Sequence, residues 1–203
     1  MRTIHAAEIS GWERFYRANF INSLTGFKSV NLIGTINKEG KTNLAIFSSI
    51  IHIGSNPALV GYINRPIAAA PHTLANIRET GTYTLNHIHP GILRQAHQTS
   101  AKYPEHISEF EAVNLSPQFV TGITAPFVAE STIKYALSLQ EIIPISLNQT
   151  FLVIGKIEQI LIAEDLVTES GFLPLEKFAS VTCNGNDAYY STQLLERFEY
   201  AKP

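Results

Sequence analysis

The chain has 203 residues, a mass of 22.5 kDa and a formal charge of −2 from 15 basic and 17 acidic residues. Its length and its 45% hydrophobic content are those of an ordinary globular protein, and we expect a single domain over residues 1–203. The basic residues are dispersed, which argues against a nucleic acid or an anionic membrane surface as partner. The single cysteine, Cys183, excludes an internal disulfide framework and a cysteine-rich zinc site. The start has no apolar signal region and no run reaches membrane-spanning length, so we expect a cytoplasmic protein.

Runs of β-branched and alternating residues predict about six strands. Two of these runs lie within residues 29–54 and flank the turn-forming sequence NKEGK, which is typical of a β-hairpin. Two longer runs, at 131–142 and 150–163, are expected to pair with each other across the sequence IPISLNQ. The remaining strands are expected at 58–63 and 82–88.

Short helices are expected between the strands. In residues 71–81, Leu74 and Ile77 lie three apart, as on one face of a helix. Thr73 can cap the start of this helix, and Gly81 can adopt the left-handed conformation that ends it. The other segments are a second short helix at 90–100, an irregular stretch with a helical turn at 101–120, and short helical or irregular elements at 172–178 and 189–200.

This order of elements is not that of strict βαβ units. Strands that are separated only by short helices and turns favour an antiparallel sheet. Such a sheet hides its edges by closing on itself. The sequence therefore predicts a mainly β fold with short helices, arranged as a closed or nearly closed barrel.

The segment TNLAIFSSI carries two kinds of side chain at one strand end. Asn43, Ser48 and Ser49 offer amide and hydroxyl groups for hydrogen bonds. Leu44, Ile46 and Phe47 offer apolar contact. One amphipathic ligand, such as a flat aromatic ring with a phosphate tail, would use both kinds.

A second polar cluster follows. Arg65 precedes His72 and Thr73, which lie at the expected start of a helix, where free N–H groups and the helix dipole favour an anion. The sequence has neither a GxxxxGK[ST] loop nor a GxGxxG motif, which argues against a nucleoside triphosphate or a Rossmann-bound dinucleotide. A phosphate-bearing ligand of another kind fits both clusters.

Along most of its length the sequence resembles the flavin reductase-like proteins, which include the flavoredoxins and bind FMN on a split β-barrel. The family pattern N-x-x-P-x-S-S matches Asn43 to Ser49, with Ile46 where proline is common. The family pattern K/R-x-T-x-x-N-I matches the expected helix start, with Thr73, Asn76 and Ile77 in register. Further matching stretches are NSLTGFKSVNLIGT, NPALVGYINRP, AHQTSAKYPEHISEFEAVNL, FLVIGKIEQI and CNGNDAYY.

The resemblance implies an FMN-binding split barrel and a set of cofactor-binding residues. Asn43 and the backbone of Ala45 would lie beside the ribityl chain and the flavin ring. The phosphate would be surrounded by the side chains of Ser48, Ser49, Arg65, His72 and Thr73. Asn76 keeps the family register and is included among the cofactor-binding residues. The ring pocket would be shaped by three residues from the segment around TSAKYPEHISEF: Ser100, Glu109 and Phe110.

The resemblance also implies an activity and an assembly. We expect an FMN-binding oxidoreductase, a flavin reductase that takes hydride from NADH or NADPH, in the form of a homodimer with FMN near the subunit interface. This chemistry needs no catalytic acid, base or nucleophile, because the cofactor carries it. The alternative is a flavin-binding electron carrier or sensor without turnover, and the sequence does not separate the two. A metal-dependent hydrolase that uses His87, His89 and His97 is a remote third option, and no metal site is predicted.

Each of these residues also has a purely structural interpretation. Asn43 could only terminate the preceding turn, and Ser48 with Ser49 could satisfy a strand edge. His72 and Thr73 could begin a helix without a ligand. Among the remaining residues, Arg65 would be a surface charge, Glu109 a solvated or capping acid, Tyr189 and Tyr190 packing residues, and Cys183 an inert thiol.

Overall fold

The computed structural model describes residues 1–69, 71–104, 106–164 and 167–202. Its strands are β1 (Lys28–Ser29), β2 (Asn31–Ile36), β3 (Thr42–Phe47), β4 (Ile50–Ser55), β5 (Ala58–Asn64), β6 (Thr82–His87), β7 (Pro117–Val120), β8 (Ile123–Val128), β9 (Ile133–Ile145), β10 (Thr150–Ile162), β11 (Val181–Asn184) and β12 (Ala188–Ser191). Its helices are α1 (Ala6–Gly11), α2 (Arg14–Leu24), α3 (Pro71–Thr80), the 3-10 turn η1 (Pro90–Ile92), α4 (Leu93–Gln98) and α5 (Glu109–Ala112). No helix among these residues is both long and apolar enough to span a membrane.

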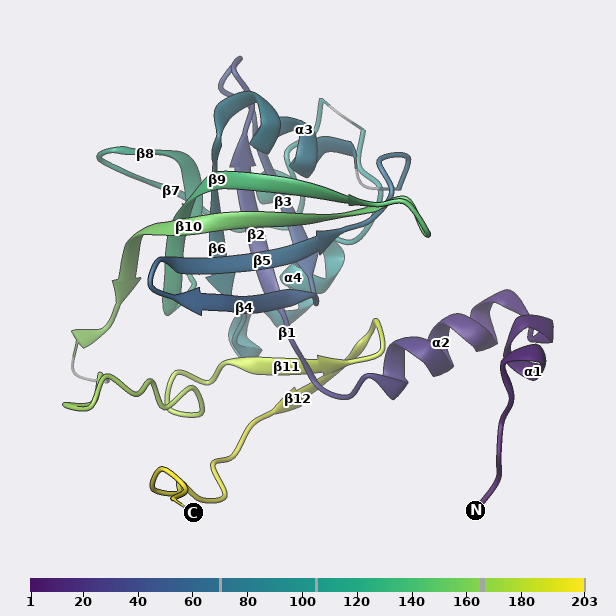
Figure 1. Cartoon of the computed structure of the whole chain (residues 1–203). Helices are drawn as coiled ribbons and strands as arrows, with labels where there is room; N and C mark the ends of the chain where they lie inside the picture. The colour runs from purple at the N-terminus through teal and green to yellow at the C-terminus, as the bar shows by residue number, and fades with distance from the viewer. Residues whose placement is uncertain (70, 105, 165–166, 203) are drawn as a thin grey trace.

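A seven-stranded antiparallel sheet forms the centre of the molecule, in the order β3-β2-β6-β9-β10-β5-β4 (Figure 1). Its two edge strands, β3 and β4, follow each other in the chain and are joined only by Ser48 and Ser49. The sheet therefore curls until its edges meet at one corner. Since β3 and β4 share no ladder, the barrel is split there, which confirms the split barrel and shows that of the two expected forms, closed or nearly closed, the barrel takes the second.

Ser49 satisfies the backbone at this corner. Its hydroxyl donates to the carbonyl oxygen of Ile63 at 3.1 Å and accepts from the N–H of Ile63 at 3.2 Å. The last pair of the β4–β5 ladder on this side is Ile50–Tyr62, and Ser49 lies opposite Ile63 at the next position. The hydroxyl of Ser49 therefore bonds the backbone groups of Ile63 that a continued ladder would have paired. The interpretation of Ser49 as a residue that satisfies a strand edge is thus confirmed.

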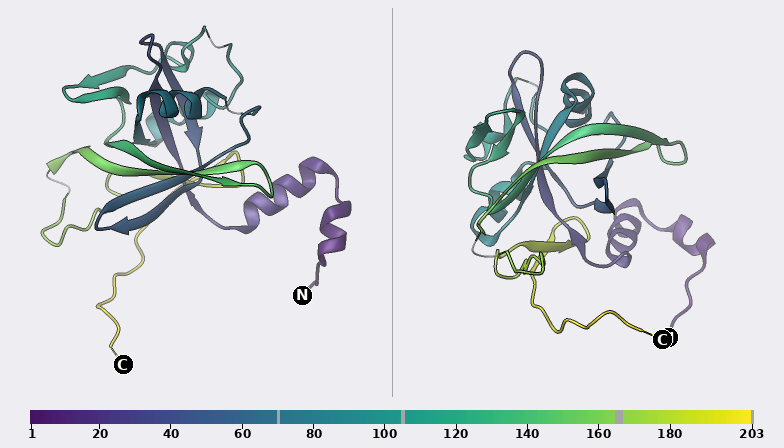
Figure 2. Two further views of the ribbon diagram at one scale, coloured as in Figure 1. Left: turned by 45° about the horizontal axis from the view of Figure 1, so that its top comes forward. Right: turned by 60° about the vertical axis from the view of Figure 1, so that its left-hand side comes forward.

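The sheet separates two hydrophobic cores. All six residues of β2 are buried, and successive side chains enter opposite cores, with Leu32 in one and Ile33 in the other. The first core lies between the sheet, α4, α5, β8 and β11, and the second fills the barrel interior beneath α3. Two views in Figure 2 show α3 over one end of the barrel. Two small sheets, β1-β11-β12 and β7-β8, complete the structure.

Most expected elements are confirmed, and the differences lie at their ends. Gly81 has φ +72° and its N–H donates to the carbonyl of Ile77 at 2.9 Å, as expected for a residue that ends a helix. Thr73 is the third residue of α3 and therefore not its cap. Strand β9 continues to Ile145, so the hairpin turn is shorter than IPISLNQ.

Other segments carry strands or helices that the sequence patterns did not predict. The expected second hairpin strand is broken at the Ser48–Ser49 corner into β3 and β4. Residues 117–120 and 188–191 form short strands rather than irregular or helical segments, because hairpin partners β8 and β11 supply their hydrogen bonds. The helices α1 and α2 were not anticipated.

Candidate functional site

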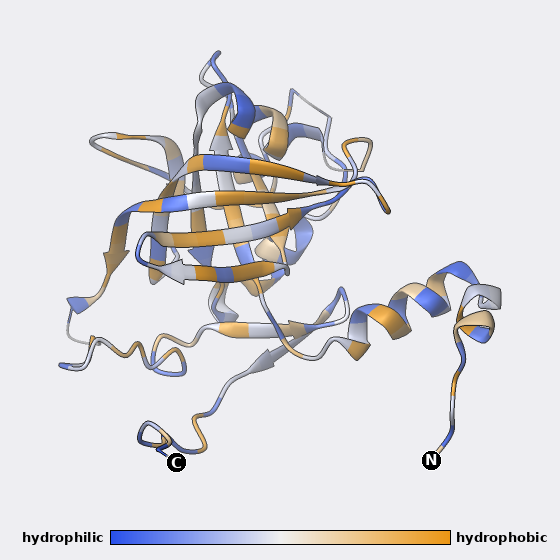
Figure 3. Cartoon of the chain, in the orientation of Figure 1, coloured by the Kyte–Doolittle hydropathy of each residue, from blue (hydrophilic) through white to orange (hydrophobic). Residues whose placement is uncertain are grey.

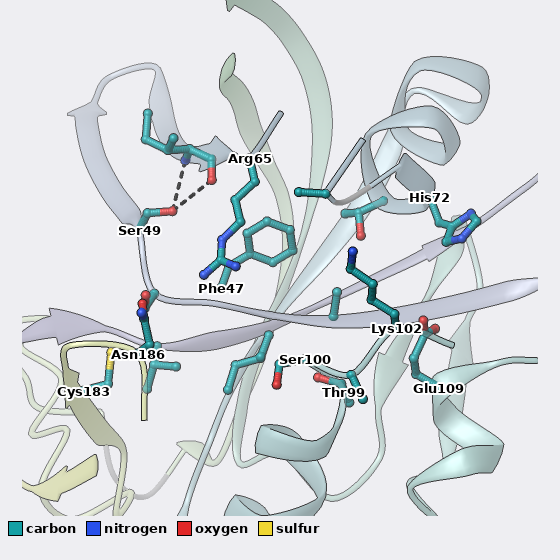
Figure 4. A pocket seen from close by; sticks show the side chains of 18 of the residues that line it. Phe47, Ser49, Arg65, His72, Thr99, Ser100, Lys102, Glu109, Cys183 and Asn186 are labelled. Atoms are coloured by element: carbon teal, nitrogen blue, oxygen red, sulfur yellow. Dashed lines mark hydrogen bonds between the residues drawn. The ribbon is translucent and has the colours of Figure 1, made fainter. Parts of the chain in front are cut away.

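A cavity of about 520 Å³ opens at the corner of the split barrel (Figure 4). Several parts of the chain surround it: the end of β3, residues 63–69 at the end of β5 and after it, the start of α3, the segment 99–103, the start of α5, the β11–β12 hairpin, and residues 22–30 from the end of α2 to the start of β2. This is the size range of pockets that hold cofactors and drug-sized ligands.

Strand β3 lines the cavity with both polar and apolar groups. Asn43, Ala45 and Phe47 alternate along the strand and therefore share one of its faces. The amide of Asn43 donates to the hydroxyl of Thr73 at 3.1 Å, and both side chains are buried. Because this bond joins β3 to α3, Asn43 does not serve the preceding turn, and that alternative is wrong.

The start of α3 forms one end of the cavity. Pro71, His72 and Thr73 all line it. In a helix of ten residues, the first backbone N–H groups have no partner within the helix, and they lie at the positive end of its dipole. This end of the cavity therefore suits an anion.

The charged side chains of the lining are mostly cationic. Lys28, Arg65 and Lys102 contribute three positive side chains, whereas Glu109 is the one acid among the described lining residues. Figure 4 shows the side chains of Arg65 and Lys102 extending into the cavity from different walls. Arg65 is exposed, but it lines the cavity and is therefore not an isolated surface charge.

Glu109 is buried, with 7% of its surface exposed, and its carboxylate accepts the N–H of Leu44 at 3.0 Å. Burial raises the pKa of this carboxyl above its usual range, while the hydrogen bond from Leu44 opposes that shift. The interpretation of Glu109 as a solvated acid is therefore wrong. It faces the cavity at the side of His72 (Figure 4).

The β11–β12 hairpin closes another side of the cavity. Cys183 is buried, and burial raises the pKa of its thiol, which disfavours the reactive thiolate. Tyr189 also lines the cavity and its hydroxyl bonds with Nδ1 of His97 at 2.8 Å. Tyr190 packs edge-on against the ring of Phe27, with centroids 4.9 Å apart, as expected of a packing residue.

The structure brings most of the predicted site residues together. The predicted residues that line the cavity are Asn43, Ala45, Ser48, Ser49, Arg65, His72, Thr73, Ser100 and Glu109. Asn76 does not line it, because its amide donates to the hydroxyl of Thr35 at 3.1 Å behind α3. Leu44 and Phe110 are fully buried in the first core and do not line it either, so the apolar contact expected of Leu44 is wrong.

The sequence patterns missed one side of the cavity. The lining residues without a prediction include Asn22, Thr25, Lys28, Thr99, Lys102 and Asn186. Lys102 lies two residues after the predicted Ser100, in a segment of the family resemblance, and its charge was the available signal. The other residues come from helix ends, turns and a short strand whose place depends on tertiary packing.

The histidines do not form a metal site in the described residues. His87 bonds with the hydroxyl of Ser180 at 3.0 Å through Nδ1, and His89 bonds with the carbonyl of Glu130 at 3.0 Å through Nε2. No group of three His, Cys, Asp or Glu side chains that could hold a metal ion occurs there. The structure gives no support to the hydrolase option.

The comparisons with known proteins agree with this geometry. The flavin reductase like domain family matches residues 27–184. A candidate flavin reductase with a split barrel domain from Shewanella frigidimarina NCIMB 400 is 45% identical, with 99% of this chain and 100% of that chain covered at a TM-score of 0.96.

Two more distant structures share the fold. Nitrilotriacetate monooxygenase component B from Bacillus cereus is 23% identical, with 98% of each chain covered and a TM-score of 0.84. An FMN-binding protein from Thermus thermophilus with bound 1-cyclohex-2-enone is 16% identical, with 98% of this chain and 99% of that chain covered and a TM-score of 0.75. With the family match across most of its length, the chain belongs to the flavin reductase-like family of flavin-binding proteins.

Proposed function

We propose that the protein is an FMN-dependent oxidoreductase, a flavin reductase that takes hydride from NADH or NADPH. The observation that carries this proposal is the cavity itself, which combines an apolar wall at β3 with cationic side chains and free helix N–H groups. The matching family and the names of the Shewanella and Thermus proteins support a flavin reductase and FMN respectively.

The donor set fits FMN. A flavin ring needs a flat, largely apolar slot, for which Ala45, Ile46 and Phe47 are available. A phosphate needs cations and N–H donors, which Arg65 and the start of α3 provide. The volume of about 520 Å³ lies within the range of cofactor pockets.

Individual residues then take separate roles. Asn43 and the backbone of Ala45 lie beside the ribityl chain and ring, while Ser48, Arg65, His72 and Thr73 surround the phosphate, with Lys102 as a further cation. The hydroxyl of Ser49 already donates to Ile63, so it retains only the capacity to accept and cannot donate to the phosphate. Ser49 therefore holds the corner of the site rather than the ligand.

The flavin supplies the two-electron chemistry when it is bound. The residues of the chain bind and orient it, and they exclude water from its ring. No catalytic acid or base is assigned. We also propose a single cytoplasmic domain over residues 1–203 that acts as a homodimer.

The test is a spectrum of the purified protein, followed by titration with FMN and anaerobic addition of NADH or NADPH. We expect the purified protein to be yellow with bound FMN, or to bind added FMN with micromolar or tighter affinity. We also expect NADH or NADPH to bleach the bound flavin at catalytic rates. Bound flavin that is not bleached would instead support an electron carrier or sensor. Protein that is colourless and does not respond to FMN would refute both.

A further inference from the structure

The small sheet β1-β11-β12 presents a row of three side chains to the cavity. Lys28 of β1 lies opposite Cys183 of β11, and Cys183 lies opposite Tyr189 of β12. Residues that are directly opposite each other in a sheet place their side chains on the same face, and all three of these residues line the cavity. Asn22 of α2 and Asn186 of the hairpin turn line it as well. We call these five residues the hairpin end of the cavity.

The hairpin end lies away from the start of α3. Figure 4 shows Cys183 and Asn186 at one side of the cavity, and His72 and Glu109 at the opposite side. In Figure 3 the turn of the β11–β12 hairpin is hydrophilic, whereas β11 itself carries hydrophobic residues. The cavity therefore has two polar ends, and the phosphate of the proposed FMN occupies only the end at α3.

Lys28 brings a positive charge to the hairpin end. Its side chain is half-buried, and its ammonium group donates to the carbonyl oxygen of Asn22 at 2.6 Å. Lys28 takes part in none of the ion pairs found in the described part of the chain. A lysine ammonium group has three N–H donors, so donors remain for a ligand in the cavity. Because the burial of an unpaired charge is unfavourable, this position favours an anionic ligand.

The neighbours of Lys28 at this end are neutral hydrogen-bonding groups. The hydroxyl of Tyr189 bonds with Nδ1 of His97 at 2.8 Å, which fixes the place of the hydroxyl in the cavity wall. Burial raises the pKa of Tyr189 to about 12, and it also raises the pKa of the Cys183 thiol, so both groups keep their protons near neutral pH. Asp187, in the same hairpin turn, is exposed and does not line the cavity.

The number of charges distinguishes the two ends. At the α3 end, Arg65, Lys102 and the free N–H groups of the helix suit the two negative charges of a phosphate monoester. At the hairpin end, one ammonium group among neutral groups suits a single negative charge, such as that of a carboxylate. Val30, which follows Lys28 by two residues, and Phe47 also line the cavity and offer apolar contact to the body of such a ligand.

We propose that the hairpin end is a binding subsite for the carboxylate of a small organic acid with a flat, apolar body. The carboxylate accepts hydrogen bonds from the ammonium group of Lys28 and the hydroxyl of Tyr189, and the body of the acid lies against the β3 wall. The acid is thus a second ligand of the cavity. Its place beside the flavin rests on the proposed function, whereas the binding of the carboxylate at Lys28 does not.

The test titrates benzoate and its neutral counterpart benzamide into the FMN-loaded protein by calorimetry, without nicotinamide. We expect benzoate to bind about tenfold more tightly than benzamide, because hydrogen bonds between charged groups are stronger than neutral ones. Lys28→Gln keeps an amide that can donate to Asn22, and it should remove the preference for benzoate without changing the affinity for FMN or riboflavin. Lys177→Gln, at an exposed lysine outside the cavity lining, is the control for the loss of one positive charge.

Two results of these titrations would overturn the proposal. The first is equal binding of benzoate and benzamide to the wild type, or a preference for benzoate that survives in Lys28→Gln. The second is weaker binding of FMN or riboflavin to Lys28→Gln, because Lys28 would then contact the cofactor. If the wild type binds no FMN, the proposed function is refuted, and the same titrations of the protein without FMN still decide whether Lys28 binds the carboxylate.

Photo-labelling of the unaltered chain with 4-azidobenzoate gives a second measurement that does not depend on the folding of a variant. We expect the labelled peptides to come from residues 22–30, 45–49 or 181–191, which form the hairpin end and the adjoining β3 wall. Excess benzoate should prevent the labelling at a lower concentration than benzamide. Labelling confined to residues 65–73 or 99–103 would place the acid elsewhere in the cavity and overturn the proposal.

Discussion

The side-chain amide of Asn43 on β3 donates to the hydroxyl of Thr73 on α3, with Nδ2 and Oγ1 3.1 Å apart and both residues buried. This bond joins the edge strand of the barrel to the first turn of the helix. Both residues line the cavity, so the same bond sets the separation of two of its walls.

Thr73→Val tests this connection. The change keeps the shape of the side chain but leaves the buried amide of Asn43 without its acceptor, and we expect the free energy of unfolding to fall by about 1–3 kcal/mol. Urea denaturation measures it. Thr73→Ser keeps the hydroxyl and serves as the control, and equal stability of the Val and Ser variants would contradict the role given to the bond.

We expect the burial of His87 to lower the free energy of unfolding in acid. Burial lowers its pKa from 6.5 to about 4, and its Nδ1 bonds with the hydroxyl of Ser180. Between pH 6.5 and 4 the unfolded chain binds a proton that the folded chain does not, so the free energy of unfolding falls as the pH falls, by at most about 3 kcal/mol.

His87→Gln should flatten this dependence, measured by chemical denaturation at pH 7 and pH 5. His106→Gln, at an exposed histidine, is the control and should follow the wild type. A His87→Gln variant that loses as much stability as the wild type between these pH values would place the acid sensitivity elsewhere.

The parts of the fold with local signals could be predicted from the sequence. The turn NKEGK and the alternation around it define the β2–β3 hairpin, and Gly81 ends α3 through a conformation that glycine adopts easily. The break at Ser48 and Ser49 could not be predicted, because the residues on both sides are apolar and equally typical of strands. Ser48 and Ser49 form a corner only because the sheet curls there.

The candidate site also has residues that could be predicted from the sequence and residues that could not. Asn43, Arg65 and Thr73 lie on or beside regular elements, where the family patterns could be aligned. Lys28 and Asn186 reach the cavity from a two-residue strand and from a hairpin turn, and no periodicity in the sequence marks such positions. Their contribution depends on the pairing of β1 with β11, a contact between distant parts of the chain.

Arg65→Ala tests the position of the phosphate. We expect FMN binding to weaken by about 1.5–3 kcal/mol, the range for a hydrogen bond to a charged group, with little change for riboflavin. Lys102→Ala measures the other cation that extends into the cavity, and Arg94→Ala, exposed on α4 and outside the cavity lining, is the control. Titration of both ligands into each variant separates the effects.

The contrast between the two ligands decides the outcome. Equal losses for FMN and riboflavin in Arg65→Ala would mean that Arg65 contacts the ring or ribityl chain. If Lys102→Ala weakens the binding of FMN but not of riboflavin, and Arg65→Ala weakens neither, then the phosphate lies at Lys102 and not at Arg65.

Glu109 should make the protein less stable as the pH rises. Burial raises the pKa of its carboxyl above the ordinary 4.5, so the folded state holds this proton more tightly than the unfolded state. The resulting stabilisation is complete below the unfolded pKa and is lost as the pH rises through the folded pKa. Glu109→Gln stays neutral, and its amide oxygen can still accept the N–H of Leu44.

The free energy of unfolding of Glu109→Gln, relative to wild type, should therefore increase between pH 4 and pH 7 in chemical denaturation. Glu111→Gln, exposed on the same short helix, is the control and should show no such trend. The same change removes the one negative side chain from the described lining, so FMN, a dianion near neutral pH, should bind more tightly while riboflavin is little affected. Weaker binding of both ligands would show instead that the ionised carboxylate itself holds the ring or the ribityl chain.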